Sequence, residues 1–207
     1  DNVMVMRLTS DSKKGKLSRI ISLESLHTDK TITADGHTIT MTGYPTPVSG
    51  DKRIGDAWKN GLKYAQQLVV RNKGGKISVV DGTKLKVEDA DEIIVLMSAA
   101  TNYVQCMDDS YNYFSQEDPL EKVQATLHKV ADKKYTALLA THQKDYHSLY
   151  DRMRLNLGNL LEAPVAPTDS LLKGMDENTN SEQENQYLEM LYFQFGRYLL
   201  ISSSREG

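Results

Sequence analysis

The sequence predicts an α+β protein, with an antiparallel β-sandwich in its first half and helices in its second half. Two observations carry this prediction. Residues 1–105 contain short alternating runs of apolar and polar side chains separated by turn residues, the pattern of half-buried strands. After Tyr103 the apolar residues recur at spacings of three and four, the period of an amphipathic helix.

Turn signals divide the first half into strands. "TITADGHTIT" places Asp35 and Gly36 between two Thr/Ile runs, which predicts a hairpin because both turn positions require positive φ. Residues 62–70 and 76–80 repeat this scheme around a Lys-Gly-Gly turn at 73–75, so we expect a second hairpin there.

Two further strands and one loop complete the first half. "VMVMRL" at residues 3–8 predicts a buried strand, and the continuous apolar stretch in "ADEIIVLMSAAT" predicts a strand buried on both faces. The segment 43–61 is rich in glycine and proline and is expected to be an extended surface loop.

The second half opens with a helix-start signal at residues 118–121. Asp118 is a good N-cap residue, Pro119 suits the first helical position, and an apolar stripe follows at Leu120, Val123, Leu127 and Val130. A second helix is expected from about Lys133, with these buried residues: Tyr135, Leu138, Leu139, His142, Tyr146 and Leu149.

The remaining segments lead to a final helix. Alternating apolar residues predict a strand at 153–157 that ends at Gly158, and residues 159–180 are expected to form a loop or linker. The final helix starts at Ser181, because Glu184 completes a capping box with it.

The final helix is apolar around most of its circumference between residues 187 and 201. Such a helix packs against neighbours on several sides, and the other segments offer few partners. We therefore expect more helices to follow it in sequence. In the chain as it stands, residues 187–201 are expected to drive self-association, because large apolar patches are seldom left in water.

Composition excludes several classes of partner. The net charge of −3 offers no general attraction to nucleic acid or to an anionic membrane. No apolar run approaches the roughly 20 residues that span a bilayer. Cys106 is the single cysteine, so it cannot form an internal disulfide and is expected to act as a small hydrophobic residue.

No active site emerges from residue chemistry alone. His142 and His147 are five residues apart and diverge on a helix, so we predict no metal site and no cofactor. Trp58 is expected to anchor its loop, although it could stack on a sugar ring. Arg197 lies in the apolar helix and is expected to need an acidic partner if it is buried.

The order of segments resembles the N-terminal region of the α-L-fucosidases of glycoside hydrolase family 95. "GLKYAQQLVV…GGKISVV…TKLKVEDADEIIVLMSAATNY" is similar to the end of that family's N-terminal β domain. "THQKDYHSLYDRMRLNLG" resembles its linker, and "APTDSLL" resembles a Pro-Thr-Asp element that follows the linker. "LYFQFGRYLLISSSREG" resembles the first helix of its catalytic (α/α)6 barrel.

The resemblance implies three parts: residues 1–105 within a β-sandwich domain, 106–180 as a helical linker with a returning strand, and 181–207 as the truncated start of the barrel. It also implies an enzyme that removes terminal α-L-fucose or α-L-galactose with inversion and without a metal. The family's general acid and water-activating groups belong to parts of the barrel that this chain does not contain. We therefore assign no catalytic residue, no carbohydrate-binding residue and no cofactor, and expect the fragment to be inactive.

The implied partner is a fucosylated oligosaccharide or polysaccharide, and because such glycans are extracellular, a periplasmic or secreted location is expected. Two alternatives stay open. The chain could be a free-standing glycan-binding β-sandwich that uses Trp58 as a stacking platform, or a structural interaction domain that dimerises through its final helix.

Overall fold

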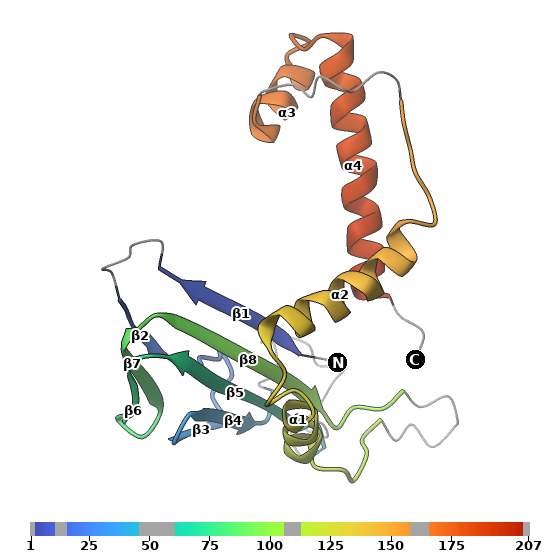
Figure 1. Cartoon of the computed structure of the whole chain (residues 1–207). Helices are drawn as coiled ribbons and strands as arrows, with labels where there is room; N and C mark the ends of the chain where they lie inside the picture. The colour runs from blue at the N-terminus through green and yellow to red at the C-terminus, as the bar shows by residue number, and fades with distance from the viewer. Residues whose placement is uncertain (1–2, 11–15, 46–60, 106–112, 158–165, 205–207) are drawn as a thin grey trace. The chain divides into compact units, whose positions relative to one another are not determined.

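A computed structural model describes residues 3–10, 16–45, 61–105, 113–157 and 166–204 (Figure 1). The chain divides into two compact units, residues 1–135 and 136–207, which we call the β unit and the helical unit. Each is described by itself. The three-part division with boundaries after residues 105 and 180 stays a prediction.

The β unit is an antiparallel sandwich of two sheets, which confirms the predicted fold class. The larger sheet has the strand order β1-β8-β5-β4-β3, and the smaller has the order β2-β7-β6. The strands are β1 Met4–Thr9, β2 Leu17–Ile21, β3 Lys30–Asp35, β4 Thr38–Gly43, β5 Tyr64–Lys73, β6 Lys76–Val80, β7 Lys84–Ala90 and β8 Glu92–Thr101.

The Asp35-Gly36 hairpin is confirmed, whereas the second predicted hairpin is wrong. Strand β3 pairs directly with β4, but Asp35 is the last residue of β3 and pairs with Thr38, so the turn consists of Gly36 and His37. Of the two predicted turn residues only Gly36 has positive φ, at 54°, which corrects the expectation that both do. Residues 73–75 also turn the chain with positive φ at both glycines, but β5 and β6 join different sheets. Both edges of β5 are already occupied by β4 and β8, so the chain after Lys73 must leave the sheet.

The core lies between the two sheets. Ile39, Leu68, Val70 and Ile93 come from the larger sheet and meet side chains of the smaller one, namely Leu17, Leu85, Val87 and Ala90. Each fully buried aliphatic side chain contributes about 1.5–3 kcal/mol relative to an exposed one. Strand β8 is buried on both faces, as predicted, since Ile93 faces the core while Ile94 and Leu96 are buried on the opposite face.

Helix α1 (Pro119–His128) covers part of that opposite face, where it packs on β5 and β8. The Asp118 carboxylate accepts a hydrogen bond from the Leu120 backbone N–H at 2.9 Å, which confirms the predicted cap. Val123 and Leu127 are buried on the inner side of the helix, and Val130 is buried just beyond its end.

Strand β1 differs from its prediction as a buried strand. It lies at the edge of the larger sheet, and the side chains of Met4 and Met6 are 61% and 54% exposed. The smaller sheet packs against β3, β4 and β5 of the larger sheet rather than against β1. Among the described residues, no strand of the smaller sheet therefore covers the two methionine side chains.

The helical unit contains most of α2 (Tyr135–Tyr150), together with α3 (Thr168–Asp176) and α4 (Glu182–Ser203). Helix α3 corrects the prediction of a loop at 159–180; Pro167 precedes its first turn, and Leu171 is buried, with α3 packing on α4. The strand expected at 153–157 is absent, because these residues pair with no other strand in the described part of the chain. No described helix is both long and apolar enough to cross a membrane.

Candidate functional site

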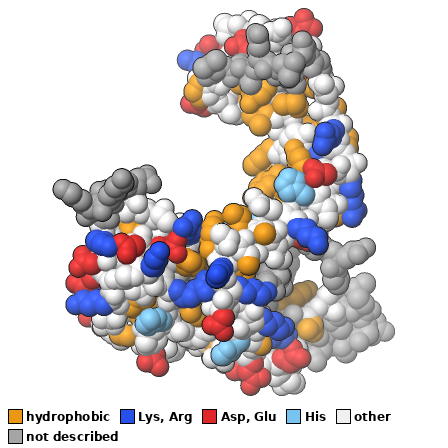
Figure 2. All heavy atoms as spheres, in the orientation of Figure 1, with side chains coloured by type: hydrophobic (Ala, Val, Ile, Leu, Met, Phe, Trp, Pro, Cys, Tyr) orange, Lys and Arg blue, Asp and Glu red, His pale blue; other side chains and the backbone are white. Residues whose placement is uncertain are grey.

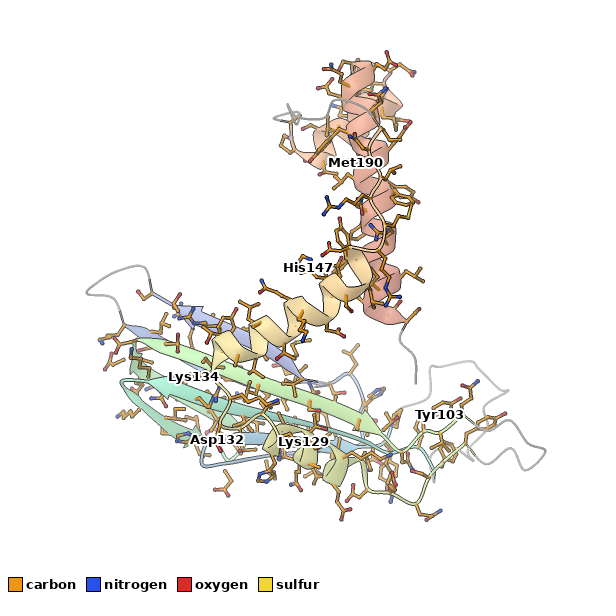
Figure 3. The ribbon with its side chains drawn as sticks, turned by 45° about the vertical axis from the view of Figure 1, so that its right-hand side comes forward. Tyr103, Lys129, Asp132, Lys134, His147 and Met190 are labelled. Atoms are coloured by element: carbon orange, nitrogen blue, oxygen red, sulfur yellow. The ribbon has the colours of Figure 1, made fainter. Side chains whose placement is uncertain are left out.

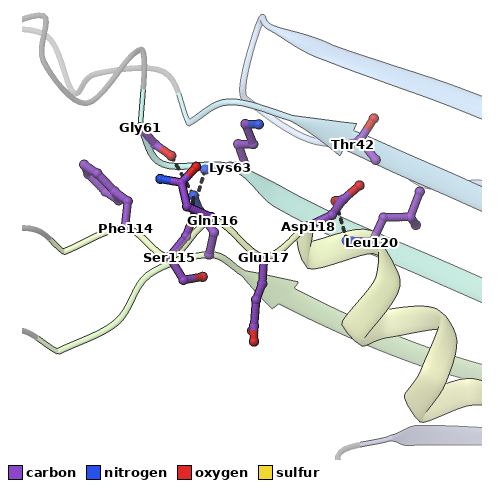
Figure 4. A pocket seen from close by; sticks show the side chains of 10 residues that line it. Thr42, Gly61, Lys63, Phe114, Ser115, Gln116, Glu117, Asp118 and Leu120 are labelled. Carbon is purple, nitrogen blue, oxygen red and sulfur yellow. Dashed lines mark hydrogen bonds between the residues drawn. The ribbon is translucent and has the colours of Figure 1, made fainter.

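A hollow of about 650 Å³ opens in the β unit where α1 begins (Figure 4). It lies beside the ends of β4, β5 and β8. Its lining is mostly polar and comprises Thr42, Gly61, Lys63, Asn102, Phe114, Ser115, Gln116, Glu117, Asp118 and Leu120.

Asn102 holds the walls of this hollow together. Its side-chain amide is buried and donates hydrogen bonds to the carbonyl oxygens of Gly61 at 2.8 Å and Ser115 at 3.3 Å. Its side-chain oxygen accepts from the backbone N–H of Lys63 at 2.7 Å. One residue therefore ties together two segments that are far apart in sequence, which makes the hollow a defined feature of the fold.

Gly61 is required by the packing of Phe114 on this wall. A Cβ atom at residue 61 would lie only 2.3 Å from Cδ2 of Phe114. The aromatic ring therefore rests directly on the glycine backbone and is held at the rim of the hollow, as Figure 4 shows.

The two carboxylates of the lining have structural partners. Asp118 caps α1, and the carboxylate of Glu117 lies 2.6 Å from the Lys122 ammonium group. Thr42, Lys63 and Gln116 add a hydroxyl, an ammonium and an amide. This set can donate and accept hydrogen bonds to the hydroxyl groups of a sugar, while the described residues contain no cluster of three or more potential metal ligands.

The predicted site residues are not brought together. Trp58 and Cys106 lie outside the described residues. His142 is exposed on α2 rather than buried, and Leu139 is also exposed, because no described element of the helical unit packs over that side of the helix. His147 lies 3.1 Å from the Asp151 carboxylate, one turn further along the chain.

Arg197 finds a different partner from the predicted acid. Its guanidinium donates to the Tyr150 backbone oxygen at 2.6 Å and to the Gln194 side-chain oxygen at 2.8 Å, and lies 4.6 Å from the centre of the Tyr150 ring. The Tyr150 carbonyl ends α2, where a positive charge is stabilised by the helix dipole. A half-buried arginine therefore needs no carboxylate here.

An aromatic cluster surrounds this contact between α2 and α4. Tyr146 stacks on Tyr150 with ring centres 5.3 Å apart and touches Tyr198, which in turn stacks on Phe195. The outer face of α4 continues the apolar surface, and Tyr192 is 81% exposed. Figure 2 shows the apolar side chains gathered on the helical unit.

The start of α4 forms the predicted capping box. Ser181 Oγ accepts from the Glu184 backbone N–H at 3.3 Å, and the Glu184 carboxylate accepts from the Ser181 backbone N–H at 2.8 Å. The hydrogen bond from the Ser181 backbone N–H, followed by that from its hydroxyl, lowers the pKa of Glu184. Hydrogen bonds from Lys86 and Lys76 similarly lower the pKa of Glu88 in the smaller sheet.

Comparison with known families places the fold among the glycoside hydrolases. The family described as "Glycosyl hydrolase family 65, N-terminal domain" matches residues 1–106, which include all of the sandwich strands. The "Glycosyl hydrolase family 95 catalytic domain" matches residues 134–207. The chain thus belongs to the family described as "Glycosyl hydrolase family 65, N-terminal domain", which matches more than half of it. The order of the two matches is consistent with the N-terminal region of a family 95 glycoside hydrolase.

Three relatives are similar to this chain. "Probable alpha-fucosidase A" of Aspergillus niger is 29% identical over the whole chain, which covers 25% of that protein. "Alpha-L-fucosidase 2" of Arabidopsis thaliana is 33% identical over the whole chain and is also covered to 25%. "Probable alpha-fucosidase A" of Aspergillus oryzae is 31% identical over 52% of the chain and 13% of that protein. The chain thus spans a quarter or less of these relatives' lengths.

Proposed function

We propose that this chain is the N-terminal region of an inverting glycoside hydrolase that removes terminal α-L-fucose, or α-L-galactose, from oligosaccharides or polysaccharides. The observation that carries the proposal is the similarity of the whole chain to proteins named as fucosidases. Because such substrates lie outside the cell, we also propose a periplasmic or secreted location.

The two carboxylates that line the described hollow have structural partners, which supports placing the catalytic pair elsewhere. Inversion needs an acid that protonates the leaving oxygen and a base that activates water, separated by about 6.5–9.5 Å. At the hollow, Asp118 is committed to the cap of α1 and Glu117 to Lys122. We therefore propose that the catalytic groups lie outside these 207 residues and that the chain alone is inactive.

The test compares the full-length enzyme with the 207-residue chain on an α-1,2-fucosylated galactoside. The full-length enzyme should release β-L-fucose as the first product, detected by NMR before mutarotation, whereas the chain alone should release none. Release of fucose by the chain at an enzyme-like rate would overturn the proposed inactivity. Release of α-L-fucose by the full-length enzyme would overturn inversion.

Helix α4 is proposed to be the first helix of the catalytic (α/α)6 barrel. Its exposed apolar residues support this, because a helix in a barrel packs against neighbours on more than one side. In the isolated chain the same face is proposed to drive self-association through residues 187–201.

Sedimentation velocity tests this second consequence. The native chain should sediment faster as its concentration rises, and a Phe195→Gln/Leu200→Gln double variant should remain monomeric. Glu189→Gln, an exposed change on the same helix, is the matched control and should associate like the native chain. A native chain that stays monomeric at high concentration would contradict the proposal.

A glycan-binding β-sandwich is the second candidate function, favoured by the polar hollow with Phe114 at its rim. It predicts binding of an oligosaccharide at millimolar concentrations, observed by NMR titration and lost in Lys63→Ala/Gln116→Ala. Lys84→Ala, an exposed change on β7, should leave binding intact. Absence of binding, or binding that is unaffected by the double variant, would remove the hollow as a glycan site.

A further inference from the structure

Two arginines lie in one row across the larger sheet. Arg7 of β1 and Arg71 of β5 are both paired with Ile94, one from each side of β8. Directly opposed residues of neighbouring strands share a face of the sheet, so both arginines lie on the face that α1 covers. They flank Ile94 close to the segment that follows α1.

Arg71 binds this segment, which we call the connector (residues 129–134). One guanidinium nitrogen donates to the carbonyl oxygens of Ala131 at 2.7 Å and Lys133 at 3.0 Å. Figure 3 labels Lys129, Asp132 and Lys134 in the connector. Charge-assisted hydrogen bonds are stronger than neutral ones, and these two are directed at carbonyl groups that no longer belong to a helix.

Arg7 holds the next residue along the chain. Its guanidinium lies 5.1 Å from the centre of the Tyr135 ring, within the range of a cation–π contact. The Glu92 carboxylate accepts a hydrogen bond from Arg7 Nε at 2.6 Å, which fixes the guanidinium in position. The two arginines therefore contact consecutive parts of the chain: Arg71 contacts the connector, and Arg7 contacts Tyr135, the first residue of α2.

We propose that Arg7 and Arg71 form a clamp that fixes residues 131–135 to the β sheet, and that both are positioning residues for the start of the catalytic domain. The match to the family 95 catalytic domain begins at residue 134, inside the clamped segment. The clamp goes beyond the proposed hydrolase function, because it depends on no property of the glycan. Without it, the connector leaves the sheet while the sandwich stays folded.

The experiment uses two lysines in the connector as reporters. Lys133 and Lys134 are exposed, and we expect trypsin to cut after them faster when this segment detaches. Hydrogen exchange at the amides of 131–135 reports the same opening. Loss of the two Arg71 hydrogen bonds should accelerate both by roughly 10- to 100-fold in Arg71→Ala, because hydrogen bonds from a charged group stabilise the attached segment more than neutral ones. Arg19→Ala, which removes an exposed arginine of β2, should change neither rate.

A double-mutant cycle tests the contact of Arg7. Arg7→Ala should accelerate opening of the connector in the native chain but have little further effect in a Tyr135→Leu background. Exchange of the β8 amides should be unchanged throughout. An equal effect of Arg7→Ala in both backgrounds would overturn its assigned role, and unchanged cleavage in Arg71→Ala would overturn the clamp.

The conservative variant Arg71→Lys keeps the test decisive if Arg71→Ala does not fold. An ammonium group at this position retains the charge but loses the planar guanidinium, so opening should fall between that of the native chain and that of a neutral Arg71→Gln variant. Equal opening in Arg71→Lys, Arg71→Gln and the native chain would contradict the proposal.

Discussion

The two units bury their apolar residues to different degrees. In the β unit, two sheets and α1 enclose most of the buried side chains, including Ile39, Val87 and Ile93, which have no exposed surface. Among the described hydrophobic residues of the helical unit, only Leu138, Leu171 and Leu188 are buried. The β unit therefore carries its own stabilisation, whereas the helical unit has little burial to offset the entropy of ordering its chain.

The largest expected effect tests this contrast directly. Ile93→Ala should destabilise the β unit by about 2–5 kcal/mol, because it leaves a cavity in a closed core. Leu188→Ala should leave the unfolding transition of the β unit unchanged and lower only the helical signal. Urea denaturation followed by hydrogen exchange in both units measures the two effects. If Ile93→Ala and Leu188→Ala destabilised the β unit equally, the proposed difference between the two units would be wrong.

Two glycines of the β unit test how closely its backbone is packed. Gly75 and Gly82 both have φ 65°, but a Cβ at residue 75 would lie 2.0 Å from the Glu88 carbonyl oxygen, whereas one at residue 82 meets nothing within 4 Å. Gly75→Ala should therefore cost about 1–3 kcal/mol more than Gly82→Ala in urea denaturation. Similar costs would show that the strand β6 shifts freely away from β7.

A glycine in the helical unit should respond in the opposite direction. Gly196 lies within α4, and an added Cβ meets nothing within 4 Å. Gly196→Ala should stabilise the helix by roughly 0.5–1 kcal/mol, because alanine loses less backbone entropy. Thermal unfolding monitored by circular dichroism measures this gain in stability. A loss of stability would indicate that this position is closely packed in solution.

The smallest effect concerns pH at the start of α4. The pKa of Glu184 is lowered from 4.5 by its hydrogen bonds to Ser181, so its carboxylate stabilises the folded helix above pH 4.5. This contribution is lost as the pH falls from 4.5 through the lower folded value. NMR protection of the Ser181 amide should fall over that window, and Glu184→Ala should abolish the step. If Glu184→Ala showed the same fall in protection, another titrating group would be its cause.

Local signals predicted the elements well. The hairpin at Gly36, the Asp118 cap and the Ser181 capping box each depend on residues within four positions, and the structure contains all three, with the turn of the hairpin one residue later than predicted. Helix α3 departs from the predicted loop: Pro167 and Asp169 are suitable helix-start residues, but the helix is short and a long polar run follows it, which is typical of a linker.

Sheet membership and the site depend on distant residues. Nothing near the 73–75 turn indicates that β6 joins β2 and β7, because that pairing is decided by β4 and β8 occupying β5. Asn102 and Gln116 carry no motif; they line a hollow only once β8 and the start of α1 are assembled. The final helix was predicted from its composition, since an apolar circumference is visible without knowledge of its partners.

The exposed methionines of β1 give this edge a chemical vulnerability that the core does not share. Peroxide converts accessible methionine to its sulfoxide, which is polar and chiral. Met4 and Met6 will be oxidised before Met41, which is enclosed in the sandwich. Oxidation of the edge strand would then leave the hydrophobic interior intact while replacing an apolar border of the sheet with a hydrated one.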